Sequence, residues 1–204
     1  MKRKKTIEKF LRTVMLVIMS IALCLEISSP AYAKVTYSTK VAAKKAYQNF
    51  MKKQGGVYFT TWDIDKDGLK ELLVTSGYPK VGNTPQYAEA YAYVNGKVKY
   101  AGKIGSPMSG ISYNASTKRL HASRGGGGGT EYWYYTLTKN KKVKQVMCGA
   151  YINGVKNGVE QYRCVYNGKK ISFSKWMKIT RKWISQGRDM DYYWNTEYNR
   201  NNFM

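Results

Sequence analysis

The stretch from Val57 to about Phe173 most restricts the fold, because it is a succession of short β-branched and aromatic runs separated by turn residues. Asn95-Gly96 and Asn167-Gly168 each join two such runs, and Asn-Gly is a strong signal for a two-residue β-hairpin turn. Long helical segments do not alternate with these runs, which disfavours a parallel α/β sheet. The stretch therefore predicts an antiparallel β-meander. The expected strands are residues 57–62, 71–75, 87–94, 97–104, 119–123, 132–138, 143–151, 159–166 and 170–173.

Helical periodicity is found before this stretch. Residues 39–54 repeat apolar side chains at helical spacing, with lysines on the other faces. Thr39 can cap the start of this helix, and Gly55-Gly56 ends it. The expected buried face consists of Ala43, Tyr47, Phe50 and Met51.

Helical periodicity returns after the β-rich stretch. A second helix is expected to begin at Ser172 or Ser174 and to end at Gly187. It could bury its Trp176 and Trp183 face in a core or lay that face on a membrane. Asp189 is expected to cap a further short helix. Its expected members are Tyr193, Trp194, Glu197 and Tyr198. The predicted class is α+β: an N-terminal helix, an antiparallel β-meander sheet and one or two C-terminal helices.

The N-terminal segment has the composition of an export signal. Six Lys and Arg residues lie within its first twelve positions, and an apolar run of about a dozen residues follows. Ala31-Tyr32-Ala33 then provides the small-x-small pattern of a signal-peptidase site. Residues 1–33 are therefore predicted to be a signal peptide, and residues 34–204 a single secreted domain. An uncleaved anchor is the alternative, and Cys24 is a weak lipid-attachment candidate.

The charge of the chain is strongly positive, with 35 Lys and Arg residues against 12 Asp and Glu residues. Removal of residues 1–33 leaves 29 basic and 10 acidic residues, a net charge of +19. An exported protein with this charge and many Tyr and Trp residues is expected to meet an anionic cell-wall polymer or glycan, with no specific nucleic acid. Solubility charge spread over the surface is the alternative. A monomer without a transmembrane span is expected.

Residues 63–71 oppose this positive charge. They read Asp-Ile-Asp-Lys-Asp-Gly-Leu-Lys-Glu and hold four of the ten acidic residues of the expected mature domain. Clustered carboxylates repel one another unless a cation neutralises them, and the alternating oxygen ligands suit Ca²⁺. An acidic Asp-Gly hairpin turn without a metal is the alternative. The predicted ligands are the side chains of Asp63, Asp65, Asp67 and Glu71 and the backbone carbonyl of Leu69.

This segment departs from an EF-hand, because Val74 stands where the closing glutamate belongs and both flanks are expected strands. It is a nine-residue D-x-D-x-D-G-x-x-E loop, and it resembles the calcium loops of integrin-type propeller blades and dockerin-like repeats. Residues 58–75 also resemble small uncharacterised secreted proteins of Gram-positive gut bacteria, in which a strand–DxDxDGxxEL–strand element is recognisable. That resemblance implies calcium binding at Asp63, Asp65, Asp67 and Glu71, and no established enzymatic activity.

Two cysteines remain in the expected mature chain, and an exported protein can oxidise them. Cys148 and Cys164 flank a predicted hairpin whose turn lies in residues 155–158. They face each other if the turn is centred near Lys156. A cross-strand disulfide is therefore expected, and two buried thiols are the alternative.

Two further motifs carry weaker signals. The glycine run in residues 124–130 lacks the Gly-Lys-Ser/Thr ending of a phosphate cradle and precedes a predicted strand, so a flexible loop between strands is expected. His121 is the single histidine, and it could form a triad with Ser123, Asp189 or a cysteine. No local hydrolase motif accompanies it.

These features favour a secreted, calcium-binding, non-enzymatic protein that associates with the anionic cell envelope. A carbohydrate-binding module that uses exposed Tyr and Trp side chains is the second interpretation, and a hydrolase is the third. Salt separates the first two, because screening weakens polyanion binding but not the stacking of sugars on aromatic rings.

Overall fold

The computed structural model describes residues 35–76, 86–105, 110–114, 117, 119–184, 187–188 and 190–204. Residues Val35–Met204 form one compact unit. The predicted signal peptide, residues 1–33, lies outside the described residues, and so does Asp189. Within the described part of the chain, no helix is long and apolar enough to cross a membrane.

The described residues form three helices and two antiparallel sheets, which confirms the predicted α+β class. The helices are α2 (Tyr37–Met51), α3 (Phe173–Ile184) and α4 (Glu197–Phe203). The five-stranded sheet has the order β12-β1-β2-β3-β4, and the seven-stranded sheet has the order β10-β9-β8-β7-β6-β5-β11. The strands are β1 (Tyr58–Trp62), β2 (Glu71–Thr75), β3 (Tyr87–Val94), β4 (Lys97–Gly105), β5 (Gly110–Asn114), β6 (Arg119–Gly126), β7 (Gly129–Leu137), β8 (Val143–Lys156), β9 (Val159–Tyr166), β10 (Lys169–Ile171), β11 (Gly187–Arg188) and β12 (Tyr193–Trp194).

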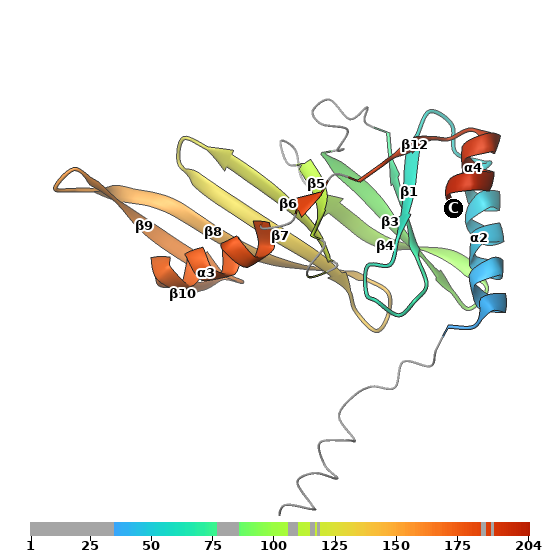
Figure 1. Ribbon diagram of the computed structural model, residues 1–204, viewed down its shortest axis with the longest axis horizontal. Helices are drawn as coiled ribbons and strands as arrows, with labels where there is room; N and C mark the ends of the chain where they lie inside the picture. The colour runs from blue at the N-terminus through green and yellow to red at the C-terminus, as the bar shows by residue number, and fades with distance from the viewer. Residues whose placement is uncertain are drawn as a thin grey trace, which may run out of the picture. The chain divides into compact units, whose positions relative to one another are not determined.

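The two sheets and the helices form successive layers (Figure 1). Helix α2 covers one face of the five-stranded sheet, where Tyr47 and Met51 pack with Phe59 and Leu72. The other face of that sheet packs on the seven-stranded sheet, in a core that joins side chains of both. Helix α3 lies on the opposite face of the seven-stranded sheet, where Trp176 packs with side chains of β8 and β9. Every sheet face is thus at least partly covered by another element, as the apolar pattern of the strands requires.

Helix α2 has the predicted buried face, with Ala43, Tyr47 and Met51 all buried. Its predicted boundaries are wrong at both ends, because Thr36, and not Thr39, caps its first turn. The helix ends at Met51, where the side-chain Nδ2 of Asn195 donates to the Met51 carbonyl at 2.8 Å. That distant amide is a second donor to a carbonyl that also accepts from the Gln54 N–H at 3.0 Å, and local sequence does not reveal it.

The predicted hairpin turns have the expected backbone conformation. Both residues of Asn95-Gly96 have positive φ angles (51° and 80°), and both residues of Asn167-Gly168 do as well (47° and 80°). Positive φ at both positions is what a two-residue type I′ turn requires. Strands β3 and β9, which lead into these turns, have the predicted bounds, and so does β2.

The glycine-rich segment is a hairpin and not the predicted flexible loop. Gly126 pairs with Gly129 across the turn Gly127-Gly128, so β6 and β7 extend through most of the segment. A Cβ on Gly129 would lie 2.4 Å from the carbonyl oxygen of Ala150 in β8. The glycine therefore allows the two backbones to approach, which explains its presence better than flexibility does.

The C-terminal segment differs most from prediction. Tyr193 and Trp194 were expected in a helix, but they form β12 and pair with Phe59 and Tyr58 of β1. The Trp194 ring meets the Tyr58 ring at a centroid distance of 4.8 Å, and this contact favours the strand. Helix α4 begins later, after its N-cap Thr196. Strands β5, β11 and β12 are all absent from the sequence prediction.

The predicted disulfide is contradicted, because Cys148 and Cys164 are free and buried. Cys148 pairs with Tyr166 and Cys164 pairs with Ala150, so the two cysteines are diagonal neighbours and do not face each other. Diagonal positions lie about 7–8 Å apart, beyond ordinary disulfide geometry. The error arose from the turn, which is centred on Asn157-Gly158 instead of Lys156; the register shift between Ile152 and Gly154 offsets only part of that displacement.

Candidate metal centre

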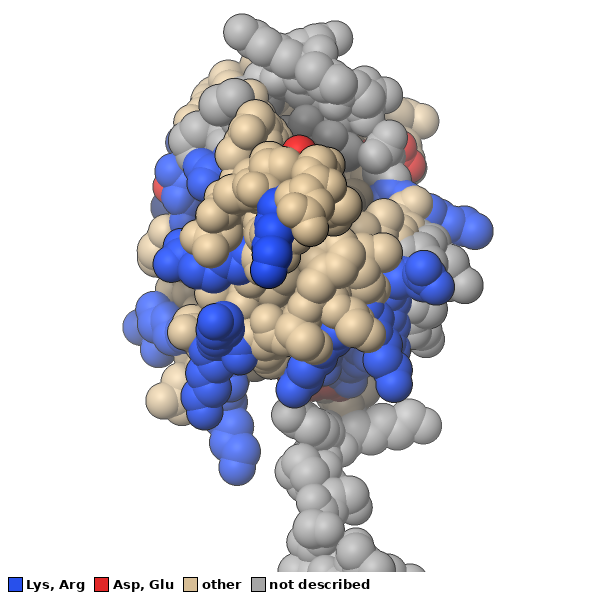
Figure 2. Space-filling model, turned by 90° about the vertical axis from the view of Figure 1, so that its left-hand side faces the viewer, with Lys and Arg blue, Asp and Glu red and all other residues tan. Residues whose placement is uncertain are grey.

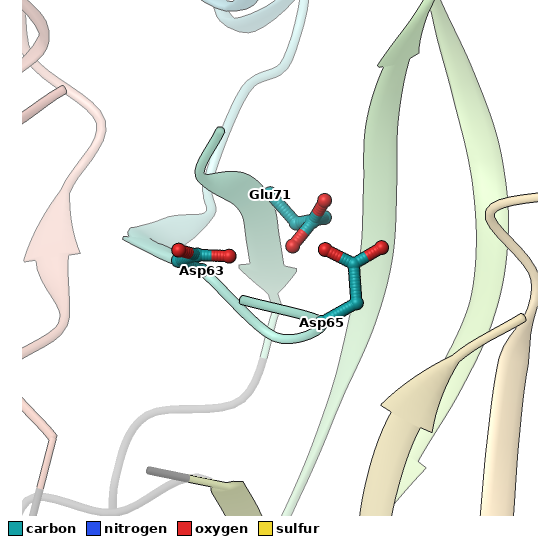
Figure 3. A group of neighbouring side chains, drawn as sticks. All are labelled: Asp63, Asp65 and Glu71. Atoms are coloured by element: carbon teal, nitrogen blue, oxygen red, sulfur yellow. The ribbon is translucent and has the colours of Figure 1, made fainter. Parts of the chain in front are cut away.

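The acidic loop, residues 63–70, connects the neighbouring strands β1 and β2. Trp62 pairs with Glu71, so the strand register brings the end of the acidic sequence back to its beginning. Lys66 (φ 64°) and Gly68 (φ 89°) have left-handed backbone conformations that let the loop turn sharply. Asp63, Asp65 and Glu71 consequently point toward a common region (Figure 3).

Carboxylate oxygens of the acidic loop and of Glu71 accept hydrogen bonds from the backbone of the loop. One oxygen of Glu71 (Oε2) accepts from the Ile64 N–H at 2.9 Å. Asp63 Oδ2 accepts from the Gly68 N–H at 3.1 Å, and Asp67 Oδ1 accepts from the Leu69 N–H at 2.8 Å. These bonds fix the carboxylates relative to the backbone, as a pre-organised cation site requires.

Helix α2 also supports the loop. The Tyr47 hydroxyl donates to the carbonyl oxygen of Lys70 at 3.1 Å, immediately before Glu71. The side chains of Ile64 and Leu69 are buried on the two faces of the five-stranded sheet, in different cores. The acidic loop is therefore anchored from both sides and is not a free surface turn.

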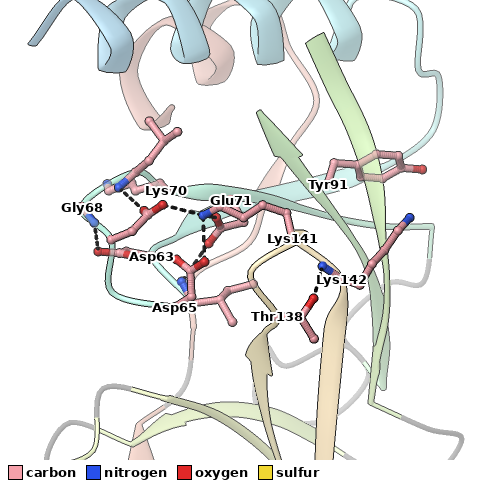
Figure 4. A network of polar contacts seen from close by, with 12 residues as sticks. Asp63, Asp65, Gly68, Lys70, Glu71, Tyr91, Thr138, Lys141 and Lys142 are labelled. Carbon is pink, nitrogen blue, oxygen red and sulfur yellow. Dashed lines mark hydrogen bonds and ion pairs between the residues drawn. The ribbon is translucent and has the colours of Figure 1, made fainter. Parts of the chain in front are cut away.

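Lys141 reaches the carboxylates from the turn between β7 and β8 (Figure 4). Its Nζ lies 2.8 Å from Asp65 Oδ2, 2.6 Å from Asp67 Oδ2 and 3.2 Å from Glu71 Oε1. Its backbone N–H donates to the Thr138 carbonyl at 2.9 Å, in a turn where Lys141 has a φ of 54°. An ammonium group from a turn of the seven-stranded sheet thus contacts three carboxylates at the β1–β2 connection of the five-stranded sheet.

Sequence reasoning missed Lys141, because the residue lies about seventy positions from the loop. Lysine is abundant in this chain, and nothing in its neighbourhood distinguishes Lys141 from the adjacent Lys139 and Lys142. The one available signal is the acidic cluster itself, which requires positive charge from somewhere in the fold.

The electrostatics of the cluster are only partly balanced. Burial raises the pKa of Glu71 to about 8, although the charge of Lys141 and the hydrogen bond from Ile64 act in the opposite direction. Burial also raises the pKa of Asp63, and the neighbouring Asp67 and Asp65 raise it further. Burial alone would lower the pKa of Lys141, but the hydrogen bonds to Asp65 and Asp67 raise it. One ammonium group does not fully compensate four carboxylates.

Two carboxylate oxygens in the cluster remain without a partner. Oδ1 of Asp63 and Oδ1 of Asp65 are buried, and neither has a hydrogen-bond partner among the described residues. Asp63, Asp65 and Glu71 each offer one oxygen, and these three oxygens lie within 4.8 Å of one another. Three convergent carboxylate oxygens form a group that could hold a metal ion.

Comparison of the chain with protein-family models, with curated proteins and with solved structures finds no match. The resemblance to secreted proteins of Gram-positive gut bacteria therefore stays a prediction, and the site has to be judged from its own geometry.

The predicted ligands are brought together only in part. Asp63, Asp65 and Glu71 form the convergent group. Asp67 lies beside it, because its Oδ2 shares the Lys141 ammonium group with Asp65 and Glu71 while its Oδ1 accepts from the Leu69 N–H. Leu69 contributes its backbone N–H to Asp67 and buries its side chain against α2. The convergent group is thus smaller than the predicted five-residue shell.

Among the described residues, no acid and no cysteine hydrogen-bonds to His121. Within the described residues its polar partner is Ser112 on β5, whose Oγ lies 3.0 Å from Nε2. Ser123, one of the alternative triad partners considered from the sequence, lies two positions along β6 and pairs with Gly110. Burial lowers the pKa of His121, and the ring lines a small hollow together with Arg119, Tyr134 and Trp183. This environment is that of a structural histidine.

Proposed function

We propose that this chain is a calcium-binding protein without enzymatic activity that acts outside the cell. The observation that carries the proposal is Asp65, whose side chain is 10% exposed and whose Oδ1 has no described partner. A buried charged oxygen without a partner is costly, and a bound cation would supply that partner. Asp63 presents a second such oxygen to the same cluster.

Calcium is the ion that these ligands suit best. The convergent atoms are all carboxylate oxygens, which hard cations prefer, and their arrangement on a turn is irregular. Calcium accepts an irregular shell with six to eight oxygens, whereas magnesium needs near-ideal octahedral geometry. Water and backbone carbonyls would complete the shell. Because Lys141 already contacts Asp65 and Glu71, we expect calcium and the Lys141 ammonium group to compete for them.

The predicted export signal and the net positive charge support a place at the anionic cell envelope. Calcium modules of extracellular proteins bind with dissociation constants of about 10⁻⁴ to 10⁻³ M, and a loop with one competing lysine belongs in that range. The +19 charge of residues 34–204 would attract anionic polymers over long distances at low salt.

The proposal is tested by calcium titration of the purified protein. At ten times its dissociation constant, an ion bound only to the folded state adds about 1.4 kcal/mol to the free energy of unfolding. For a domain of this size, that corresponds to a rise of about 3–6 °C in the melting temperature. Magnesium at the same concentration is expected to give a smaller rise.

Two isosteric variants locate the effect. Asp65→Asn removes the charge of the buried ligand and should abolish the calcium response. Asp191→Asn is the matched control, because Asp191 is an exposed acid outside the loop. Equal melting curves in calcium and in chelator, with no calorimetric heat at millimolar calcium, would contradict the proposal and leave Lys141 as the permanent counter-ion of the loop.

A further inference from the structure

A groove of about 940 Å³ lies between α3 and the outer face of the seven-stranded sheet. Its walls combine aromatic rings with basic side chains, and no Asp or Glu is among the described residues that line it. Figure 2 shows Lys and Arg side chains spread around the end of the molecule that lies on the left in Figure 1, with few acidic groups among them. The aromatic and basic side chains that line the groove include Arg119, Tyr134, Tyr166, Lys178, Lys182 and Trp183.

The aromatic part of the groove is contributed by both the sheet and the helix. The Tyr134 ring meets the Trp183 ring edge to face, with centroids 4.7 Å apart, and the Tyr166 ring lies 6.3 Å from Trp183. All three side chains are half-buried, so part of each stays open to the groove. The buried Asn114 donates its Nδ2–H to the Trp183 carbonyl at 2.5 Å and thereby ties the end of α3 to β5. The rings are therefore held in place before any ligand arrives.

The basic part of the groove has no acidic counterpart. The Arg119 guanidinium group lies 4.9 Å from the centre of the Tyr134 ring, in cation–π geometry. Lys178 and Lys182 are exposed and one helical turn apart on α3, so they project from the same side of the helix. None of the three forms an ion pair within the described part of the chain. Like charges placed together without acidic partners favour an anion between them.

We propose that this groove binds an anionic glycan, a sugar chain that carries carboxylate or phosphate groups. The inference rests on the proposed association with the anionic cell envelope and assigns that association to one site. Aromatic rings contact the apolar faces of sugars, while Arg119, Lys178 and Lys182 neutralise the charges along the chain. The tyrosine hydroxyls of Tyr134 and Tyr166 can bond to sugar hydroxyls.

A glycan fits the groove better than a nucleic acid strand. Unpaired bases bind by stacking flat on successive open ring faces. Here Trp183 meets the Tyr134 ring edge to face, so the two rings do not form a flat platform for a stack of bases. No two of the groove rings described here lie parallel, since the angles between their planes are 85° and 52°.

The test uses polygalacturonate oligosaccharides, which carry one carboxylate per sugar, at low and at physiological salt. Lys178→Gln/Lys182→Gln is expected to weaken this binding about tenfold or more, because two charges facing the glycan are lost. The matched control is Lys52→Gln/Lys53→Gln, which removes the same charge from exposed positions after α2. Its binding should change less than twofold. Equal losses in both variants would overturn the inference, because the charge would then act evenly over the surface.

The aromatic contribution is measured with Tyr134→Leu and with three comparison ligands. The wild-type protein should bind polygalacturonate more tightly than neutral dextran and more tightly than inorganic polyphosphate, which has charge but no sugar rings. Tyr134→Leu should weaken polygalacturonate binding and leave polyphosphate binding unchanged. If Tyr134→Leu does not fold, the lysine pair alone decides. Tighter binding of dextran, or of single-stranded DNA, would overturn the inference.

The groove proposal can be refuted while the calcium proposal stands. Each groove variant should keep the wild-type rise in melting temperature with calcium, which also shows that it is folded. If the wild-type protein responds normally to calcium but does not bind polygalacturonate, the groove proposal alone is refuted. Polygalacturonate binding that survives in Asp65→Asn, together with loss of the calcium response in that variant, would show that the two sites act separately.

Discussion

Lys141→Met is expected to destabilise the calcium-free protein and to tighten calcium binding. The ammonium group contacts Asp65, Asp67 and Glu71, and Lys141 itself is only 17% exposed. Removing one partner from a buried charge pair costs about 3–5 kcal/mol. The partial exposure of the lysine places its removal at the lower limit, about 3 kcal/mol. Methionine retains the volume of the aliphatic stem, so the loss arises from charge.

The same contacts set the expected gain in calcium affinity. If calcium releases Lys141 from the carboxylates, the substitution costs nothing in the calcium-bound state. The free energy lost by the calcium-free protein then reappears as tighter binding, and about 3 kcal/mol corresponds to roughly a 100-fold lower dissociation constant. The melting temperatures of the variant and the wild-type protein should differ by about 6–12 °C in chelator and should converge at saturating calcium.

Calorimetric titration and thermal unfolding at several calcium concentrations measure both effects. Lys142→Met is the matched control, because the Nζ of Lys142 donates to the Tyr100 carbonyl and not to the acidic loop. That control should leave calcium affinity unchanged. If Lys141→Met lowers stability equally with and without calcium, or if its affinity equals that of the wild-type protein, then the lysine and the ion do not compete and the reasoning is refuted.

Three further outcomes are expected. Gly68→Ala should lower the free energy of unfolding by about 1–2 kcal/mol, because a residue with a side chain disfavours the φ of 89° even though no atom lies near the added Cβ. Urea titration measures this loss, and an unchanged midpoint would show that the loop relaxes freely. Burial raises the pKa of Cys148 to about 11 and also raises that of Cys164, so alkylation of both thiols at pH 8 should be slow in the folded protein. In denaturant without reductant, alkylation should label two thiols, and no labelling would indicate a disulfide. Burial lowers the pKa of His121 below its ordinary 6.5, so the unfolded state takes up the proton first and stability should fall as pH drops below about 6.5. His121→Gln should lack this part of the pH dependence, and an identical slope would contradict it.

The sequence predicted what local chemistry determines. Asn-Gly turns, alternating apolar residues and the spacing of Ala43, Tyr47 and Met51 act within a few residues, and the structure contains the corresponding elements. Asp63, Asp65 and Glu71 were found for the same reason, because the turn that gathers them is encoded in nine consecutive positions. Local signals of this kind do not depend on the rest of the fold.

The sequence predictions are wrong where a contact with a residue distant in the chain determines the local structure. Asn195 donates to the last carbonyl of α2, Tyr58 pairs with Trp194 in a strand, and Lys141 supplies the counter-charge of the loop. Each is a tertiary contact that local propensity does not contain. The predicted cysteine pairing failed for a more local reason, because a displacement of the turn is enough to change which residues face each other, and the register shift compensates it only in part.

Strands β11 and β12 have a consequence for the order of folding. Gly187 pairs with Asn114 and Trp194 pairs with Tyr58, so each sheet receives one edge strand from residues that are synthesised after all its other strands. A chain that emerges with its amino terminus first can form the meanders from neighbouring contacts, which close rapidly. The outer edges of β1 and β5 nevertheless stay open to foreign strands until residues 187–194 arrive. A chain truncated after Ile184 should therefore keep its local hairpins but associate with other copies through these two edges.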